Sequence, residues 1–196
     1  MNESRTRSLV LCGLSIALLT AGAFIAVPFG PIVFSLQSLM LMFIVLILKP
    51  KEALAAVSGY LLLGAAGLPV GAGFRGGLSW LLGPTGGFLI GFLVGVALIA
   101  ALRGLPFLRA RSAHVWPLGQ VMAFDGAQTL VIILVYYLFG TLWFVVSTGA
   151  TVPAALMACV LPFIVPDLLK AAAALLAAQP VRAALGRSVV RPREQI

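Results

Sequence analysis

The sequence predicts an all-α integral membrane protein, a single domain over residues 1–196 that folds as a six-transmembrane-helix bundle with both termini cytoplasmic. Two observations indicate the fold class. Hydrophobic residues make up 62% of the chain and charged residues only 9%, whereas soluble domains contain about 25% charged residues. Apolar stretches also recur along the whole chain, which excludes a single anchor or a signal peptide followed by a secreted domain. A third observation, the placement of the basic residues, gives the orientation.

The chain contains six apolar segments of roughly the 20 residues that a transmembrane helix needs. We expect the spans at 8–27, 33–48, 53–69, 84–103, 118–139 and 163–181. Proline and glycine mark most of the breaks, and Lys49-Pro50-Lys51 separates the second span from the third. The segment 151–160 is too short to cross, so we expect a helix that lies at the outer surface.

The basic residues gather on one side of the predicted bundle. With the N-terminus in the cytoplasm, 11 of the 13 basic residues lie inside, and the outer segments 28–32 and 140–162 carry none. The inside residues are Arg5, Arg7, Lys49, Lys51, Arg103, Arg109, Arg111, Arg182, Arg187, Arg191 and Arg193. Because membrane proteins concentrate Lys and Arg in cytoplasmic loops, both termini should be cytoplasmic. The same rule accounts for the net charge of +8 without a nucleic-acid partner.

Two basic residues break this pattern, and the first is Lys170, inside the sixth span. It follows Asp167 by three residues, so the two side chains share a helix face and can form an ion pair. Ionisable groups at membrane depth cost at least about 2.5–3.5 kcal/mol, so they usually pair and often mark functional sites. Pro166 favours a helix start beside them, which places the pair in the outer turns. The pair either orients the sixth helix or binds a ligand.

The second exception is Arg75, in the outer loop between the third and fourth spans. The loop sequence GAGFRGG (71–77) is mostly glycine and alanine, so its backbone can approach another group closely. The guanidinium offers a planar fork of donors that suits a carboxylate, a urea-like carbonyl or the side chain of Asp167. A ligand arriving from the outer side and lipid headgroups are the alternative partners.

Asp125 is the third ionisable residue within a predicted span, and no basic residue lies near it in sequence. We expect either a ligand role or packing against Gln128 or Thr129. The sequence contains no metal-ligating cluster, no phosphate-binding loop and no hydrolase motif, which argues against an enzyme. Two alternatives stay open: an intramembrane enzyme that uses Asp125 and Asp167 as an acid pair, and a non-transporting membrane assembly protein.

Three segments together resemble one known family. The central signature of the BioY family, the biotin-specific substrate-binding (S) components of energy-coupling-factor (ECF) transporters, is similar to residues 61–92, LLLGAAGLPVGAGFRGGLSWLLGPTGGFLIGF. The family's VPFTLQ segment resembles residues 33–39, VFSLQSL, and its last-helix segment with an aspartate and a lysine resembles residues 161–176, LPFIVPDLLKAAAALL. The chain departs from the pattern at VFSLQ, which lacks the proline and threonine, and at Gly71, where a bulky residue is common. Those two changes would alter the shape of the pocket.

The resemblance implies that the protein captures biotin at the outer side of a prokaryotic cytoplasmic membrane. Uptake would require a complex with a transmembrane coupling protein and two ATPase subunits, and we expect no cofactor and no metal. By position, the resemblance makes Arg75 and Lys170 donors to the carboxylate or the ureido oxygen of biotin, and Asp167 an acceptor for a ureido N–H. Further candidate binding residues are Gly73, Gln37, Tyr60 and Asp125.

Two small residues in the first span have a separate role in this hypothesis. Ala17 and Ala21 are spaced four apart, which lets another helix approach closely. They resemble the small-residue motif with which S components dock onto the coupling protein. Packing inside the bundle is the alternative.

Overall fold

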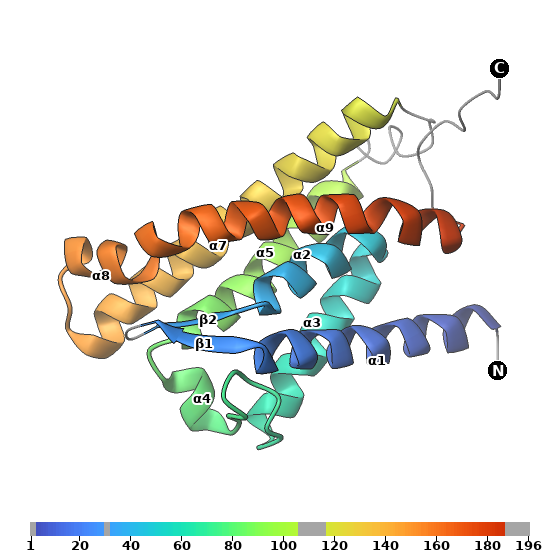
Figure 1. Ribbon diagram of the computed structural model, residues 1–196. Helices are drawn as coiled ribbons and strands as arrows, with labels where there is room; N and C mark the ends of the chain where they lie inside the picture. The colour runs from blue at the N-terminus through green and yellow to red at the C-terminus, as the bar shows by residue number, and fades with distance from the viewer. Residues whose placement is uncertain (1–2, 30–31, 106–116, 187–196) are drawn as a thin grey trace.

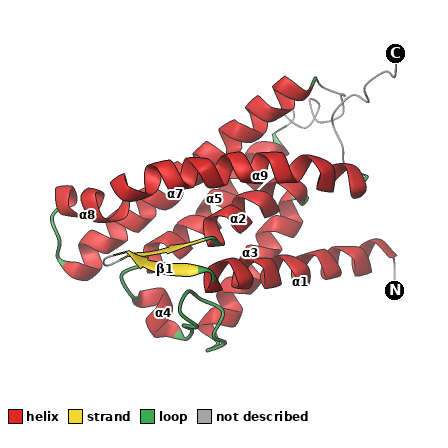
Figure 2. Ribbon diagram, viewed as in Figure 1, coloured by secondary structure: helices red, strands yellow, loops and turns green. Residues whose placement is uncertain are grey.

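The structure, a computed structural model, describes residues 3–29, 32–105 and 117–186. This part of the chain is helical apart from one short hairpin and the connecting loops (Figures 1 and 2). The helices are α1 (Glu3–Phe24), α2 (Gln37–Ile47), α3 (Pro50–Ala65), α4 (Leu78–Leu82), α5 (Gly86–Gly104), α7 (Leu118–Thr148), α8 (Val152–Cys159), the 3-10 helix η1 (Leu161–Phe163) and α9 (Ile164–Ala184). The hairpin pairs β1 (Ala26–Phe29) with β2 (Ile32–Ser35) in antiparallel register. The prediction of a mainly helical protein is confirmed, whereas the hairpin was not expected.

The long helices pack side by side into an elongated bundle (Figure 1). α1 begins and α9 ends toward one end of the bundle, which we call the terminal end. The β1–β2 hairpin, α4 and α8 lie toward the other end, which we call the hairpin end. The predicted basic positions Arg109, Arg111, Arg187, Arg191 and Arg193 lie outside the described residues.

Four segments of the described chain are long and apolar enough to cross a membrane. They are Arg5–Phe24, Gly86–Gly104, Leu118–Thr148 and Val152–Ala184, the last of which comprises α8, η1 and α9. α2 has 11 residues and α3 has 16, so at 1.5 Å per residue they extend about 16 and 24 Å. Both are shorter than the hydrocarbon core of a bilayer, which is about 30 Å thick.

The predicted span at 33–48 was wrong in its first part, because residues 32–35 form β2 and the helix begins only at Gln37. β-branched and aromatic residues make up half of β1 and most of β2, and Pro28 cannot continue a helix from α1. The first span therefore ends at Phe24 and not at residue 27. α7 instead runs past the predicted residue 139 to Thr148, where Gly149 adopts the left-handed conformation (φ 70°) that ends many helices.

The expected short helix within 151–160 is present as α8, with Pro153 in its first turn. Its position at the membrane surface stays a prediction.

Glycines bring α5 and α7 into direct backbone contact farther along the bundle. A Cβ added at Gly91 would lie 2.6 Å from the Cα of Tyr136, and one at Gly87 would clash with Trp143. Small residues at such a seam let two membrane helices approach closely.

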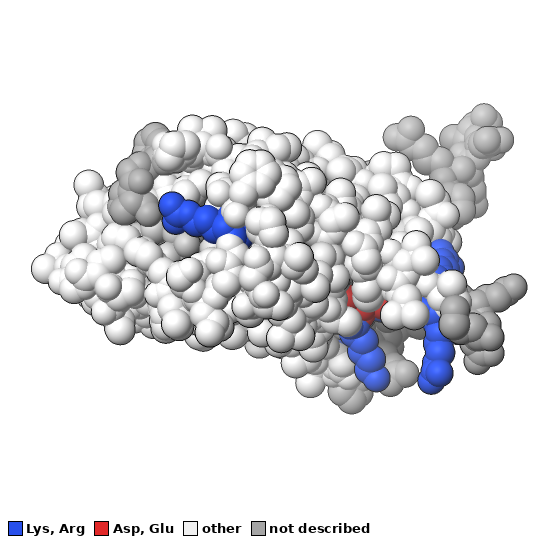
Figure 3. All heavy atoms as spheres, turned by 90° about the horizontal axis from the view of Figure 1, so that it is seen from below, with Lys and Arg blue, Asp and Glu red and all other residues white. Residues whose placement is uncertain are grey.

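Many large apolar side chains cover the outside of the bundle. Exposed examples are Leu9 (67%), Leu134 (67%), Val146 (80%) and Leu176 (68%). On the face shown in Figure 3, Lys and Arg side chains appear toward the two ends, and the middle is uncharged. An apolar surface of this extent is unusual for a soluble protein and suits contact with lipid.

Candidate ligand-binding site

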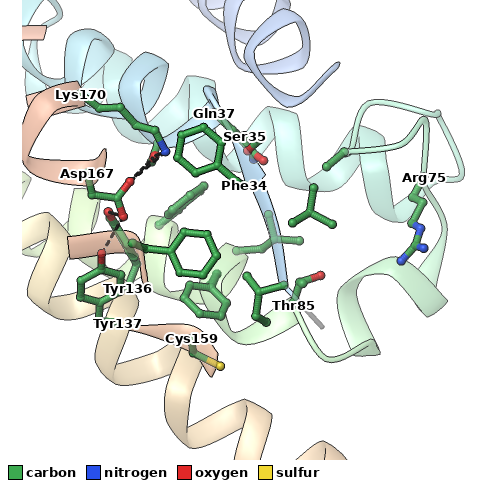
Figure 4. Close-up of a pocket in the computed structure, with 18 of the residues that line it drawn as sticks. Phe34, Ser35, Gln37, Arg75, Thr85, Tyr136, Tyr137, Cys159, Asp167 and Lys170 are labelled. Carbon is green, nitrogen blue, oxygen red and sulfur yellow. Dashed lines mark hydrogen bonds and ion pairs between the residues drawn. The ribbon is translucent and has the colours of Figure 1, made fainter. Parts of the chain in front are cut away.

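A pocket lies at the hairpin end, bordered by β2, α2, α5, α7, α9 and the loop that precedes α4. Its walls are largely aromatic, formed by Phe34, Trp80, Phe88, Phe92, Tyr136, Tyr137 and Phe163. The charged groups stand on two sides of it: Asp167 and Lys170 on one side and Arg75 on the other (Figure 4). Three of the four charged residues that the sequence singled out thus line one pocket.

Asp167 and Lys170 form the predicted ion pair. The distance from Lys170 Nζ to Asp167 Oδ1 is 2.8 Å, and the two side chains are only 7% and 6% exposed, respectively. α9 begins two residues before Pro166, so the pair occupies its first two turns, as expected. Because a lone buried charge would be strongly unfavourable, the pair keeps this side of the pocket electrically neutral.

Two adjacent tyrosines, which the sequence-based prediction did not include, also bind Asp167. Tyr136 donates from its hydroxyl to Asp167 Oδ2 at 2.7 Å, and Tyr137 donates to the same oxygen at 2.8 Å. Both side chains line the pocket from α7. The only signal in the sequence was a pair of hydroxyl-bearing aromatic residues inside an otherwise apolar span, and it named no partner.

Ser38 and Phe34 complete the surroundings of Lys170, and the sequence did not single them out either. The ammonium donates to Ser38 Oγ at 3.1 Å, and Ser38 in turn donates to Asp167 Oδ1 at 3.3 Å. The Phe34 ring centroid lies 4.0 Å from Lys170 Nζ, a distance typical of a cation–π contact. The first turn of α2 and the end of β2 therefore fix the lysine that α9 supplies.

Arg75 sits in a loop that is held by one backbone hydrogen bond within the loop and by another to α3. Gly71 N donates to Arg75 O at 2.8 Å, and Gly77 N donates to Gly64 O at 2.7 Å. Phe74 adopts a positive φ of 58°, uncommon for a residue with a side chain, and its ring centroid lies 4.3 Å from that of Phe24 in α1.

The guanidinium of Arg75 has no hydrogen-bonding partner among the described residues, and its side chain is exposed. The alternative that Arg75 pairs with Asp167 is wrong, since the carboxylate of Asp167 is engaged by Lys170, Ser38 and the tyrosines. Arg75 thus stands as a cation available to a ligand at the exposed side of the pocket (Figure 4).

The other candidate binding residues occupy different positions. Gln37 lines the pocket and donates to the hydroxyl of Tyr60 at 3.2 Å. Tyr60 does not line it, but its hydroxyl donates to Val70 O at 3.0 Å and so supports the loop from behind. Gly73 lies at the exposed turn of that loop with a φ of 70°, where a side chain would be strained.

Asp125 lies outside the pocket, toward the terminal end, and has a basic partner after all. Arg182 of α9 binds its two carboxylate oxygens at 2.6 and 3.1 Å. Gln128 also donates to Asp125, at 3.4 Å, as one alternative had it, whereas Thr129 bonds to Gly126 O instead. The hypothesis of an acid pair with Asp167 is wrong, because each aspartate is paired with its own basic side chain.

The remaining sequence candidates are simple to place. Ala17 and Ala21 are both exposed on α1, so they do not serve the internal packing of the bundle. Cys12 and Cys159 are free thiols, and Cys159 is buried in the wall of the pocket. Across residues 3–29, 32–105 and 117–186, no group of three or more His, Cys, Asp or Glu side chains could hold a metal ion.

Comparisons with known proteins agree with one another. The model of the BioY family matches residues 1–187. The chain is 35% identical over 175 residues to the probable biotin transporter BioY of Pyrococcus horikoshii, covering 89% of this chain and 96% of that protein. It is 33% identical over 188 residues to the biotin transporter BioY of Rhizobium etli, covering 94% of each.

A solved structure shares the fold. It is a crystal structure of the S-component for biotin from an ECF-type ABC transporter, with a TM-score of 0.81 and 23% sequence identity. The match covers 93% of this chain and 94% of that one. At this level of identity the likeness concerns the fold alone.

Proposed function

The chain belongs to the BioY family, and from that membership we propose that it captures biotin and serves in biotin uptake as the S component of an ECF-type ABC transporter. One observation carries the proposal for this chain: a buried, neutral Asp167–Lys170 pair faces an aromatic pocket, and on its other side stands Arg75, a cation without a partner in the part of the chain that the structure describes. Biotin has matching parts, since it consists of a neutral ureido ring, an apolar thioether ring and a valerate carboxylate.

The charges of the pocket favour one orientation of the ligand. A carboxylate placed beside Asp167 would bring two anions together in a buried region, which is unfavourable. The neutral ureido group suits that side, because its oxygen can accept from Lys170 and an N–H can donate to the cluster around Asp167. The valerate carboxylate then meets Arg75, whose fork of donors matches it.

We also propose six membrane crossings with both termini in the cytoplasm and the pocket facing the outer side of a prokaryotic cytoplasmic membrane. The short α2 would complete the second crossing together with the hairpin before it. The start of α1 and the end of α9 lie at the same end of the bundle, as an even number of crossings requires (Figure 1). Exposed Arg5, Arg7, Lys49 and Lys51 fit the cytoplasmic side.

The energy for uptake would come from partners, a transmembrane coupling protein and two ATPase subunits. The sequence has no phosphate-binding loop that could use ATP itself. The exposed Ala17 and Ala21 support docking of the coupling protein on α1, since small residues admit a second helix to close packing.

Biotin binding to the purified chain tests the proposal. By titration calorimetry in detergent, the unaltered protein should bind biotin tightly, and Lys170→Ala and Arg75→Ala should each weaken binding severely. Lys51→Ala, which removes an exposed cation away from the pocket, is the matched control and should bind like the unaltered chain. Unchanged affinity in both pocket variants would refute the site, and no binding by the unaltered chain would favour a membrane assembly protein.

The orientation has its own test. Biotinamide, in which a neutral carboxamide replaces the carboxylate, should bind the unaltered protein about as weakly as biotin binds Arg75→Ala. Combining the analogue with the variant should cause little further loss, because both remove the same interaction. Additive losses would mean that the carboxylate lies elsewhere.

A further inference from the structure

The carboxylate of Asp167 is fully engaged by the protein itself. Oδ1 accepts from Lys170 Nζ at 2.8 Å and from Ser38 Oγ at 3.3 Å. Oδ2 accepts from the hydroxyls of Tyr136 at 2.7 Å and Tyr137 at 2.8 Å. An ionised carboxylate offers about four lone-pair sites. A ligand N–H can therefore reach Asp167 only by taking the place of one of these four donors.

Lys170 and Ser38 are poorly suited to yield. Withdrawal of Lys170 would leave Asp167 as a buried anion without its cation, which is strongly unfavourable. Ser38 accepts from Lys170 while it donates to Asp167, so the three groups form a closed ring of hydrogen bonds. The donor that yields should thus be a tyrosine hydroxyl on Oδ2.

The two tyrosines differ in how firmly they are held. The ring of Tyr136 packs edge-on against Phe92 at 5.4 Å and lies 6.4 Å from Phe88, and its backbone abuts Gly91. Among the residues described, Tyr137 has one aromatic neighbour, Tyr136 itself, with ring centroids 4.9 Å apart. Tyr137 is also the more exposed of the two, at 9% against 2%. Tyr136 is fixed by the α5–α7 seam, and Tyr137 is the freer to turn.

We infer that Tyr137 is a specificity-determining residue: its hydroxyl occupies the position on Asp167 Oδ2 that a ligand N–H takes, and it turns aside when the ligand binds. Tyr136 stays in place and orients the carboxylate. The inference rests on the proposed binding of biotin, whose ureido ring carries two N–H groups. A ligand without an N–H at this position cannot replace the displaced hydroxyl, so the tyrosine acts as a filter for ureido donors.

The pair Tyr137→Phe and Tyr136→Phe tests this, because the two variants remove the same atom from the same carboxylate oxygen. With Tyr137→Phe, the ligand N–H finds a free lone pair, so biotin should bind about fivefold tighter, the typical effect of one hydrogen bond. With Tyr136→Phe, a permanent orienting donor is lost, so biotin should bind about fivefold weaker. Titration calorimetry gives the affinities, and thermal unfolding with size-exclusion chromatography verifies that each variant is folded.

A biotin analogue methylated on both ureido nitrogens distinguishes an effect of hydrogen bonding from an effect of the space that Tyr137→Phe opens. It has no N–H to place on Oδ2, so Tyr137→Phe should bring it no gain. An equal gain for biotin and the analogue would overturn the inference, since the variant would then only make room. Equal losses of biotin affinity in the two tyrosine variants, or no change in either, would also overturn it while leaving biotin capture intact. No biotin binding by the unaltered chain would overturn both.

Discussion

The described residues form two buried acid–base pairs that involve α9: Asp167 and Lys170 both lie on it, whereas its Arg182 pairs with Asp125 of α7. The two pairs differ in what else they touch. Near the hairpin end, Lys170 binds Asp167 beside the pocket. Toward the terminal end, Arg182 binds Asp125 away from it, and the same guanidinium donates from Nε to Leu46 O at 2.6 Å. One pair faces space that a ligand can enter, and the other faces the backbone of α2. Burial and pairing alone thus do not identify a binding site in a membrane bundle.

The second pair has a structural task at the end of α2. The last four carbonyl groups of a helix have no partner within it, and an apolar environment supplies none. Arg103 of α5 donates to Val45 O at 2.9 Å, and Arg182 of α9 donates to Leu46 O. Asp125 holds Arg182 in place. Arginines from two neighbouring helices therefore cap the end of α2.

The largest expected effect is on stability. Arg182→Met leaves the side chain of Asp125, 3% exposed, without its cation, and should lower the free energy of unfolding by about 3–5 kcal/mol. Unfolding by titration with sodium dodecyl sulfate measures the change. Biotin affinity of the folded fraction should stay within about threefold of the unaltered chain, because distant sites act independently. A severe loss of biotin affinity in Arg182→Met, with unchanged stability, would contradict the difference in role between the two pairs.

Lys170→Met should differ from Arg182→Met in its effect on biotin binding. Removal of the cation should weaken biotin binding by about 100-fold, a typical cost of truncating one partner of a buried charge pair. Protonated 2-iminobiotin, whose guanidinium can pair with the remaining Asp167, should bind this variant better than biotin does. Competition between the two ligands gives the ratio, and a variant that still prefers biotin would show that Lys170 does not set the charge preference.

A double variant sharpens the structural half of the comparison. Adding Asp125→Leu to Arg182→Met removes the unpaired buried anion, so it should recover about 1–3 kcal/mol of the lost unfolding free energy. Recovery should be incomplete because Leu46 O still lacks the arginine that capped it. The same titration measures it, and a double variant less stable than Arg182→Met alone would contradict this account.

The smallest effect is expected at Thr141 of α7. Its buried hydroxyl has no hydrogen-bonding partner within the described residues, and an unpaired buried polar group is unfavourable. Thr141→Val removes the hydroxyl at nearly constant volume, so stability should stay equal or rise by up to about 1 kcal/mol. A loss in the same unfolding titration would mean that the hydroxyl does have a partner.

Local patterns in the sequence predicted the local features of the site. The spacing of Asp167 and Lys170 predicted their contact because three residues along a helix bring two side chains onto one face. The departure of Arg75 from the charge asymmetry predicted its place at the pocket. The first prediction needed only residues close in sequence, and the second needed only the rule that basic residues concentrate on the cytoplasmic side.

Features that depend on contacts between distant parts of the chain could not be predicted from the sequence. Ser38 is separated from Asp167 by 129 positions and Arg182 from Asp125 by 57, so only the packing of the helices brings them together. The hairpin was missed for another reason: its strands have the composition of an apolar membrane helix, and 33–48 reads as a continuous span. The tyrosines had no partner that periodicity could point to.

Most membrane helices must both pack within the protein and match the thickness of the bilayer, whereas the short α2 needs only to pack. Eight of its 11 residues are buried within the protein, so lipid hardly touches it, and hydrophobic matching to the bilayer does not govern its length. The exposed helices α1 and α7 must match the bilayer thickness instead, since they present leucines to the outside. A thicker or thinner bilayer should therefore tilt the outer helices first and leave the spacing between Ser38 and Lys170 unchanged.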